Sequence, residues 1–242
     1  IIVTPSHHRV HHAINPEYID KNYGQIFILW DKWFGTYQEE LAHVTPVYGI
    51  TRPVQTWNPI KINFMHLWLL IKDAWRTKSW NDKLRIWFMP TGWRPEDVAD
   101  KFPVFKIDDV YHFKKYDTPA SRSLQVWSWV QIGTALLFIS YLFGNIAYIN
   151  QLNPSYIYIY GAFVFLMVYA YTELMDHNQY ALIPEYIKNG WGLYILYSTG
   201  DWFGATQFWP QANIVIALYF VVATLIPFAL VYEMKRKPVL AE

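Results

Sequence analysis

The chain has 242 residues, of which 53% are hydrophobic and 19% aromatic, and its formal net charge is only +1. Such a composition is typical of proteins that contact a membrane, and no basic stripe interleaved with aromatic residues indicates a nucleic-acid partner. Cysteine is absent, which excludes disulfides, thiolate metal sites and a catalytic thiol. Any metal must therefore bind to nitrogen and oxygen.

Charge is distributed unevenly along the chain. Sixteen of the twenty Lys and Arg residues lie at or before Arg122, one is Lys188, and three form the run Lys235, Arg236 and Lys237. The chain begins with Ile1 and has no signal-peptide pattern. Because a chemically distinctive motif follows within a few residues, we expect functional sequence upstream, and a chain that is the C-terminal part of a longer protein.

Histidine is concentrated in the run His7-His8-Arg9-Val10-His11-His12. On a helix, His8, His11 and His12 occupy positions i, i+3 and i+4, so their imidazoles share one face and a metal can collect all three. Zinc, copper and iron all accept neutral imidazole. We expect Thr4-Pro5-Ser6 to cap the helix, with Ser6 near its N-terminus, and Asn15-Pro16 to end the helix.

The isolated histidines are predicted to be hydrogen-bonding or interfacial residues rather than ligands. They are His43, His66, His112 and His177. A pair of redox metals needs more ligands than three imidazoles supply, so the remaining ligands are expected upstream of Ile1.

Two amphipathic helices are predicted in the polar first half, over residues 60–75 and 80–88. Either could face a protein core or lie in the plane of a membrane interface. Residues 124–149 contain no Asp, Glu, Lys or Arg and exceed the ~20 residues needed to cross a bilayer. We predict a spanning helix there, a polar turn at 150–154 and a second span at 156–175.

Two further apolar segments follow. Residues 184–204 are a weak span, with a short apolar centre, and residues 214–232 are an uncharged span that tolerates Pro227. Basic residues before and after the spans place both ends on the cytoplasmic side, which requires an even number of crossings. We therefore predict four spanning helices, with Lys188 at the cytoplasmic end of the weak one. Aromatic residues near the span ends are predicted to form an interfacial belt: Trp127, Trp129, Tyr156, Tyr158, Tyr160, Trp191, Trp202 and Trp209. Glu173, Asp176 and His177 are interpreted as turn residues.

The sequence around the histidine run resembles the last histidine box of the fatty acid hydroxylase and sterol desaturase superfamily. The resemblance rests on residues 4–12, on Asp20-Lys21-Asn22-Tyr23-Gly24, and on Trp30-Asp31-Lys32 with Phe34-Gly35-Thr36. Further along, Tyr48-Gly49-Ile50-Thr51, Trp57-Asn58-Pro59-Ile60 and Gly92-Trp93-Arg94-Pro95 resemble the alkylglycerol monooxygenase subgroup and its bacterial relatives.

This resemblance implies an all-α integral membrane protein, with a cytoplasmic histidine-box layer over residues 1–122 and a transmembrane region over residues 123–242. It implies a di-iron oxygenase that uses O2 to hydroxylate or desaturate a lipid such as an alkylglycerol, a fatty acid or a sterol. His8, His11 and His12 would be iron ligands, and the second-shell candidates are His7, Asn15, Asp20, Asn22 and Asp31.

Electrons would come from tetrahydrobiopterin or from another donor that these residues do not identify. The chain by itself would be inactive, since the superfamily's earlier histidine boxes are absent. The topology suits a bacterial inner membrane, which we favour over the endoplasmic reticulum. For Asp20, Asn22 and Asp31, a role as turn or cap residues is equally consistent with the sequence.

Two other classes of function stay open. A membrane zinc hydrolase would need an acidic general base beside the box, as in His-Glu-x-x-His, but Arg9 and Val10 occupy those positions. A polytopic scaffold or transporter with an incidental histidine cluster predicts charged or small-residue pathways in the spans, whereas these spans are bulky and aromatic.

Overall fold

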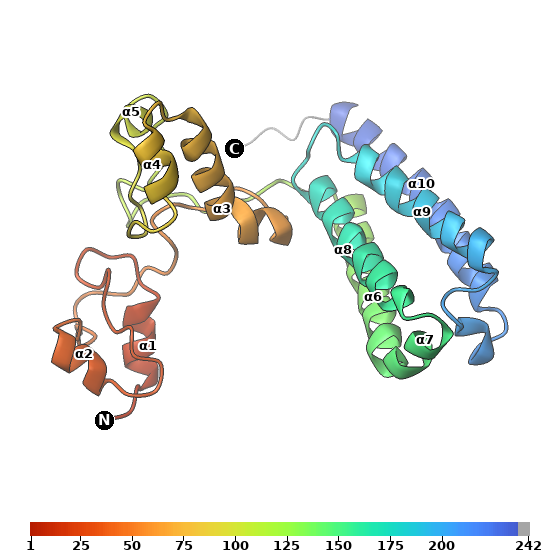
Figure 1. The fold of residues 1–242 in the computed structure, drawn as a ribbon, viewed down its shortest axis with the longest axis horizontal. Helices are drawn as coiled ribbons and strands as arrows, with labels where there is room; N and C mark the ends of the chain where they lie inside the picture. Colours follow the sequence, from red (N-terminus) through yellow and green to blue (C-terminus); the bar gives the residue numbers. More distant parts are fainter. Residues whose placement is uncertain (237–242) are drawn as a thin grey trace. The chain divides into compact units, whose positions relative to one another are not determined.

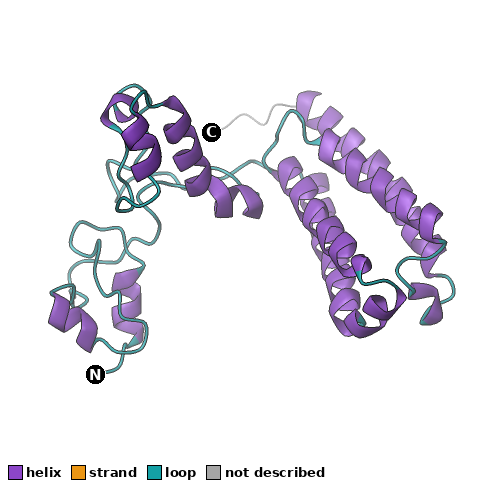
Figure 2. Ribbon diagram, viewed as in Figure 1, coloured by secondary structure: helices purple, strands orange, loops and turns teal. Residues whose placement is uncertain are grey.

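The computed structural model describes residues 1–236, and every regular element in that range is a helix (Figures 1 and 2). The elements are α1 (Pro5–His11), α2 (Leu29–Phe34), α3 (Pro59–Arg76), α4 (Trp80–Arg85), α5 (Glu96–Ala99), α6 (Arg122–Gly144), α7 (Ile146–Leu152), α8 (Ser155–Met175), α9 (Leu182–Thr199), the 3-10 helix η1 (Ala205–Gln207) and α10 (Ala212–Arg236). The all-α prediction is confirmed. Lys237, the end of the predicted basic tail, lies outside the described residues.

The chain forms two compact units. The histidine unit comprises residues 1–55 and 66–116, and the bundle unit comprises residues 56–65 and 117 onward. Helix α3 therefore begins in the bundle unit and ends in the histidine unit. The functional division expected at residues 122/123 stays a prediction, because compactness alone does not assign a role to either part.

The predicted helix at 60–75 is confirmed as α3, whereas α4 ends three residues before Phe88, the predicted end of the second helix. Along α3 only Asp73 is buried, and Phe64, Trp68 and Trp75 are 53%, 58% and 87% exposed. A helix that buries a carboxylate and turns aromatic rings outward favours an interfacial position over a core-facing one.

The bundle unit consists of four long antiparallel helices, α6, α8, α9 and α10 (Figure 1). α8 packs against α6 and α9, and α9 packs against α10. Because each helix runs opposite to the one before it, the chain enters and leaves this unit at the same end. Within the described residues, α6, α8 and α10 are long and apolar enough to cross a membrane.

The first predicted span is shorter than expected. The sequence predicted one helix over 124–149, but α6 ends at Gly144 and α7 begins at Ile146. Asn145 leaves the helical conformation at φ −124° and ψ 17°, and its side-chain amide donates to the Tyr141 carbonyl at 3.0 Å. Such local side-chain bonding competes with helix continuation, so an asparagine in an otherwise apolar run ended the span early.

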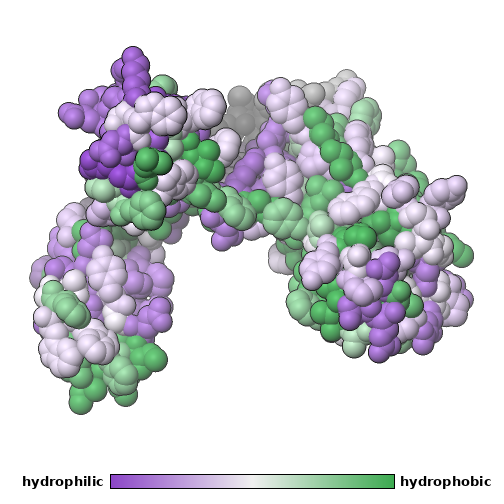
Figure 3. Space-filling view, in the orientation of Figure 1, coloured by the Kyte–Doolittle hydropathy of each residue, from purple (hydrophilic) through white to green (hydrophobic). Residues whose placement is uncertain are grey.

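The bundle is apolar on its outside, and its mostly apolar interior encloses a few polar and charged side chains. Leu137, Leu225 and Tyr197 are 72%, 65% and 88% exposed, and hydrophobic side chains cover much of this unit's surface in Figure 3. In contrast, Glu185 and Lys188 of α9 are fully buried. An apolar exterior that encloses charged side chains is unfavourable in water and favourable in a lipid bilayer. The chain is therefore part of an integral membrane protein.

An aromatic core holds the four helices together. Phe138, Phe163, Trp202 and Phe220 contact one another with ring centroids 5.0–6.5 Å apart. A Cβ added at Gly192 would lie 2.4 Å from the Phe220 ring, so glycine lets α9 and α10 approach closely. The core also contains Trp127, Tyr160 and Trp202, which the sequence had assigned to an interfacial belt, and that assignment was wrong for these three.

Candidate metal-ligand cluster on helix α1

The local sequence fixes where α1 begins. Thr4 is the cap: its hydroxyl accepts from the His7 backbone N–H, and the His7 Nδ1 accepts from the Thr4 backbone N–H at 3.1 Å. This reciprocal capping box satisfies two otherwise unpaired N–H groups. The predicted cap segment Thr4-Pro5-Ser6 is confirmed with Thr4 as the capping residue, and the Ser6 hydroxyl donates to Glu40 at 2.7 Å. His7 is thereby engaged in holding the helix start.

The other three histidines of the run gather on one exposed face. Ring centroids are 4.4 Å apart for His8 and His12, 5.0 Å for His11 and His12, and 6.1 Å for His8 and His11. All three side chains are exposed. The predicted i, i+3, i+4 geometry is therefore present, although α1 ends at His11 with His12 as its C-cap, before the predicted stop at Asn15-Pro16.

The donor set fits part of a metal centre. Imidazoles that share an ion at the ~2.1 Å metal–nitrogen distance have centroids roughly 5 Å apart, which matches the two pairs that include His12. Within residues 1–236, however, no group of three or more His, Asp or Glu side chains is placed to hold a metal ion.

Asp31 holds the segment that packs against the histidine face of α1. Its carboxylate is 2% exposed and accepts hydrogen bonds from Tyr23 N, Gly24 N and the Thr36 hydroxyl at 2.7, 2.9 and 2.7 Å. The Tyr23 ring in turn packs edge-on against His11 at 6.2 Å. A Cβ at Gly24 would lie 2.7 Å from an Asp31 carboxylate oxygen, so the Asn-Tyr-Gly and Trp-Asp segments are parts of one structure.

Burial by itself would raise the pKa of Asp31. The bonds from Thr36, Gly24 and Tyr23, together with the nearby His11, outweigh that effect and lower its pKa below the ordinary value. The group is therefore an anion in the folded protein.

Two buried asparagines hold the loops around α1. Asn22 donates to the carbonyls of His7 and Gln38 at 3.3 and 2.8 Å and accepts from Gln38 N at 2.9 Å. Asn15 accepts from Val47 N at 2.6 Å and donates to the Thr45 carbonyl at 3.1 Å. Since Asn22 binds the backbone of His7, it fixes the helix rather than a ring.

Asp20 and Asn22 both adopt left-handed conformations, at φ 57° and 54°, which Asn and Asp tolerate better than other non-glycine residues. Asp20 accepts from the Tyr23 hydroxyl at 2.9 Å. The Asp20 and Asp31 carboxylates thus both bind Tyr23, the residue whose ring contacts His11.

An ion pair that sequence analysis missed borders the cluster. Arg9 donates to both oxygens of Glu40 at 2.5–3.1 Å, and Ser6 donates to the same carboxylate. The bond from Arg9 lowers the pKa of Glu40. His8, Arg9, His12, Tyr48, Gly49 and Ile50 line an open hollow beside it. Nothing in the local sequence linked Glu40 to α1, since the two are separated by 31 residues.

The isolated histidines do not join the cluster. His112 pairs with Asp109 at 2.8 Å, and His43 and His66 are exposed. His177, at a positive φ of 52°, has a buried Nε2 without a hydrogen-bond partner.

In the bundle unit, two acidic residues at the end of α8 do more than close a turn. Glu173 accepts from the amides of Asn58 and Asn178 at 2.7 and 2.5 Å and pairs with Lys61 at 2.5 Å. Asp176 accepts from Trp57 N at 2.7 Å and from the Thr56 hydroxyl. These bonds attach the start of α3 to the end of α8. The sequence signal that could have predicted this contact is the pair of acidic residues at the end of an otherwise uncharged span.

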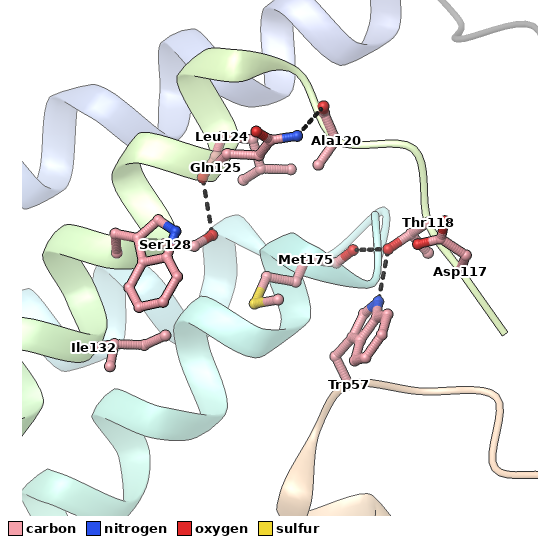
Figure 4. A pocket seen from close by; sticks show the side chains of 10 residues that line it. Trp57, Asp117, Thr118, Ala120, Leu124, Gln125, Ser128, Ile132 and Met175 are labelled. Carbon is pink, nitrogen blue, oxygen red and sulfur yellow. Dashed lines mark hydrogen bonds between the residues drawn. The ribbon is translucent and has the colours of Figure 1, made fainter.

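A small cavity of about 270 Å³ lies beside this attachment (Figure 4). Leu124, Ser128 and Ile132 of α6 line it together with Met175 of α8 and Trp57. Trp57 donates to the Thr118 hydroxyl at 2.7 Å, and Thr118 donates to the Met175 carbonyl at 2.8 Å. Its lining is mostly apolar, with polar groups at one end.

Residues 1–36, which include the whole histidine run and the Asp31 support, match the fatty acid hydroxylase family. The match and the relatives below support the fatty acid hydroxylase superfamily. It is 32% identical over 192 residues to alkylglycerol monooxygenase of Homo sapiens, a match that covers 78% of this chain and 41% of the relative.

Alkylglycerol monooxygenase of Xenopus tropicalis is 29% identical over 188 residues, with 78% of this chain and 41% of the relative covered. That of Danio rerio is 40% identical over 105 residues, with 41% and 23% covered. The chain thus spans about two fifths of the length of the first two relatives. No solved structure matches the chain.

Proposed function

We propose that this chain is the C-terminal part of a membrane-bound, non-haem di-iron monooxygenase that hydroxylates a lipid with O2. The observation that carries the proposal is the trio of exposed imidazoles of His8, His11 and His12 on one face of α1, within the segment that matches the fatty acid hydroxylase family. An alkylglycerol is the first substrate to test, because relatives that match 78% of the chain carry that name. A fatty acid or a sterol is the next, and desaturation is the alternative outcome.

His8, His11 and His12 would hold the iron, with His12 nearest to both of the others. Iron supplies the activation of O2 that attack on an unactivated C–H bond requires and that no side chain provides. Three imidazoles cannot complete the coordination of two ions, so further ligands are expected from sequence that the longer relatives have and this chain lacks. The electron donor we propose is tetrahydrobiopterin or another small reductant.

The chain's own residues keep those imidazoles in place. Asp31 fixes the backbone of Tyr23 and Gly24, and the Tyr23 ring limits the rotation of His11. Asn22 ties the carbonyl of His7 to the loop at Gln38. Rigid support of this kind orients ligands before metal binds, and we assign His7, Asn15, Asp20, Asn22 and Asp31 this supporting role.

A zinc hydrolase is less well supported by the same geometry. Its general base would have to be a free carboxylate beside the histidines. Glu40, which borders α1, accepts hydrogen bonds from both Arg9 and Ser6. Its carboxylate is therefore not free to act as a general base. Asp31 is buried and accepts three bonds.

We further propose that α9 is a fourth membrane crossing, with the histidine layer of residues 1–122 on the cytoplasmic side and residues 123–242 as the membrane region. The 18 residues of α9 extend ~27 Å, close to the hydrocarbon thickness, and its charged residues are buried inside the bundle. A bacterial inner membrane is the proposed location. The lipid substrate would enter laterally from the bilayer.

The test uses the complete protein that contains this chain, purified in lipid nanodiscs. Iron content is measured together with O2 uptake and product formation from a 1-O-alkylglycerol, with and without reduced pterin. About two irons per protein and lipid-dependent O2 uptake are expected. One zinc per protein without O2 uptake would refute the oxygenase.

Variants then assign the ligands. His12→Ala is expected to reduce turnover by at least about 100-fold, a loss typical of disturbing a metal's ligands, and to lower iron content while membrane insertion is unchanged. His66→Ala, an exposed histidine outside the cluster, is the matched control and should retain activity. Full turnover in His12→Ala would remove that residue from the ligand set.

A further inference from the structure

Helix α3 carries an exposed apolar stripe where it lies in the histidine unit. Trp68, Ile71 and Trp75 occupy positions i, i+3 and i+7, so they share one side of the helix, and they are 58%, 40% and 87% exposed. Asp73, on the opposite side, is the buried residue of α3. A surface helix of a water-soluble protein normally turns its apolar side inward, so this helix presents the reverse arrangement.

A second exposed apolar set follows at α4. Trp80, Leu84 and Phe88, at positions i, i+4 and i+8, are 78%, 70% and 88% exposed. The Lys83 ammonium donates to the Trp75 carbonyl at 3.1 Å and lies 5.7 Å from the centroid of the Trp80 ring. The two sets therefore meet where α3 ends and α4 begins. Together they form what we call the apolar face: Trp68, Ile71, Trp75, Trp80, Leu84 and Phe88.

Cations border the apolar face. Lys72 and Arg76 each follow a residue of the face by one position, which places them ~100° further around α3, at the side of the stripe. Lys78 lies just after the end of the helix and is exposed. We call Lys72, Arg76 and Lys78 the basic rim. Long cationic side chains can lay their alkyl stems along apolar surface while the charged ends reach a polar layer.

Nearby acidic residues leave the rim positively charged. Asp73 is bound by Arg94 at 2.6 Å, and Asp82 lies 3.6 Å from Arg85. The Asp97 carboxylate accepts two hydrogen bonds from the loop after α3, each at 2.9 Å, and offsets at most one of the three rim charges. An exposed apolar patch beside an excess of cations is complementary to a surface that is apolar in one layer and anionic in the next.

The start of α3 is attached to the end of a membrane span. At the end of α8, Glu173 accepts from the Asn58 amide at 2.7 Å and Asp176 accepts from the Trp57 backbone N–H at 2.7 Å. Because α8 is long and apolar enough to cross a membrane, α3 begins at the level where a span leaves the hydrocarbon. From that level, a helix with an exposed Trp-rich side and flanking cations has the pattern of an in-plane interfacial helix.

We propose that the apolar face and the basic rim bind the surface of a bilayer that contains anionic phospholipids. The apolar face enters the boundary between headgroups and acyl chains, and the rim pairs with headgroup phosphates. Each Lys or Arg near an anionic surface strengthens such binding about fivefold. The inference is independent of the proposed function, because it concerns the bilayer surface on which the histidine unit docks and not the lipid that is oxidised.

The experiment attaches one nitroxide at a time to the complete protein in nanodiscs, on a cysteine-free background to which this chain contributes no cysteine. The labelled positions are Ile71→Cys, Trp75→Cys and Leu84→Cys. His66→Cys, exposed on the other side of α3, is the matched control. Collision rates with O2, which concentrates in lipid, and with a water-soluble nickel chelate report depth. In discs with about one third phosphatidylglycerol, the O2-to-nickel ratio at the three positions should exceed the control at least about fivefold.

The charge of the surface is tested next. Exchanging phosphatidylglycerol for phosphatidylcholine, or changing all three rim residues to Gln in anionic discs, should lower the ratio at least about threefold. Changing three exposed lysines outside the rim to Gln is the matched control and should leave the ratio unaltered; these are Lys106, Lys114 and Lys115.

Three results would overturn the proposal. One is a ratio in anionic discs that equals the His66→Cys control, which would mean that the face remains in water. Another is low collision rates with both reagents, which would mean that protein covers the face. The third is equal immersion in phosphatidylcholine and phosphatidylglycerol, which would leave the basic rim without a role.

Discussion

The two units differ in how completely their buried polar side chains are hydrogen-bonded. In the histidine unit, Asn15, Asn22 and Asp31 are almost fully buried and bonded to backbone groups or hydroxyls of nearby loops. In the bundle unit, Gln131, Glu185 and Asn189 are equally buried and retain atoms without partners. Buried groups whose bonds are all made stabilise one conformation, whereas buried atoms without partners are costly to the fold.

The buried ion pairs extend the comparison. Asp73 accepts two bonds from Arg94, at 2.6 and 3.0 Å, and Arg94 also donates to the Phe102 carbonyl. In the bundle unit, the Lys188 ammonium donates to Glu185 and lies within 3.5 Å of the Gln131 side-chain oxygen. The Arg94 pair ties three segments of the histidine unit together, while the Lys188 pair links α9 to α6 and leaves one Glu185 oxygen free.

The largest expected effect comes from breaking the bundle pair. Lys188→Met leaves the Glu185 carboxylate buried without its counter-ion, which typically costs about 3–5 kcal/mol of unfolding free energy. Equilibrium unfolding in mixed detergent micelles measures it. The double variant Glu185→Gln with Lys188→Met removes both charges and should recover most of the loss. A cost below about 1 kcal/mol in Lys188→Met would mean that the pair is solvated.

The next effect tests the support under the histidines. Asp31→Ala leaves two backbone N–H groups and the Thr36 hydroxyl without their acceptor, and we expect a loss of about 3 kcal/mol at neutral pH. Iron content should fall as well, because Tyr23 no longer holds His11. Thr36→Val, which removes one of the three donors, is the graded control and should cost about 1 kcal/mol.

Asp31 also sets an acid limit on stability. Its folded-state pKa is lowered, so the unfolded chain binds its proton first as pH falls. Stability from this group is therefore complete above the unfolded value near ~3.9 and decreases as pH falls through the lower folded-state value. Unfolding curves between about pH 5 and pH 2 should show this decline in wild-type protein and a weaker one in Asp31→Asn. Identical declines would exclude Asp31 as a source.

A smaller effect compares close glycine contacts in the two units. A Cβ at Gly24 would lie 2.5 Å from the Phe27 carbonyl oxygen, whereas one at Gly192 meets the side chain of Phe220. Backbone yields less readily than a ring, so Gly24→Ala should cost about 2–3 kcal/mol and Gly192→Ala about 1–2 kcal/mol. Gly133→Ala has no neighbour within 4 Å and should be neutral or slightly stabilising. The reverse order in thermal unfolding would contradict this reading.

The smallest effect is the loss of the α1 cap. Thr4→Ala removes the hydroxyl that accepts from His7 N and should cost about 1 kcal/mol. Thr4→Ser keeps the hydroxyl and should restore most of it. Thermal unfolding of the two variants in parallel checks the prediction, and equal stability would show that the His7 side of the capping box is sufficient.

The sequence by itself determined the helical class, the spans at α8 and α10, the amphipathic α3 and the shared face of His8, His11 and His12, because each depends on the spacing of residue types within one segment. It failed where a local bond competes with a pattern. Asn145 ended α6 at Gly144, five residues before the predicted end of the span.

Only the tertiary structure decided which distant groups meet. Glu40 reaches Arg9, Asp31 supports the loop before it, and Gln131, Lys188 and Tyr219 come together from three helices. It also placed Trp202 and Tyr160 in the core instead of at an interface. These contacts depend on how complete helices and loops pack against one another. The spacing of residues within one segment does not indicate which other segment it will contact.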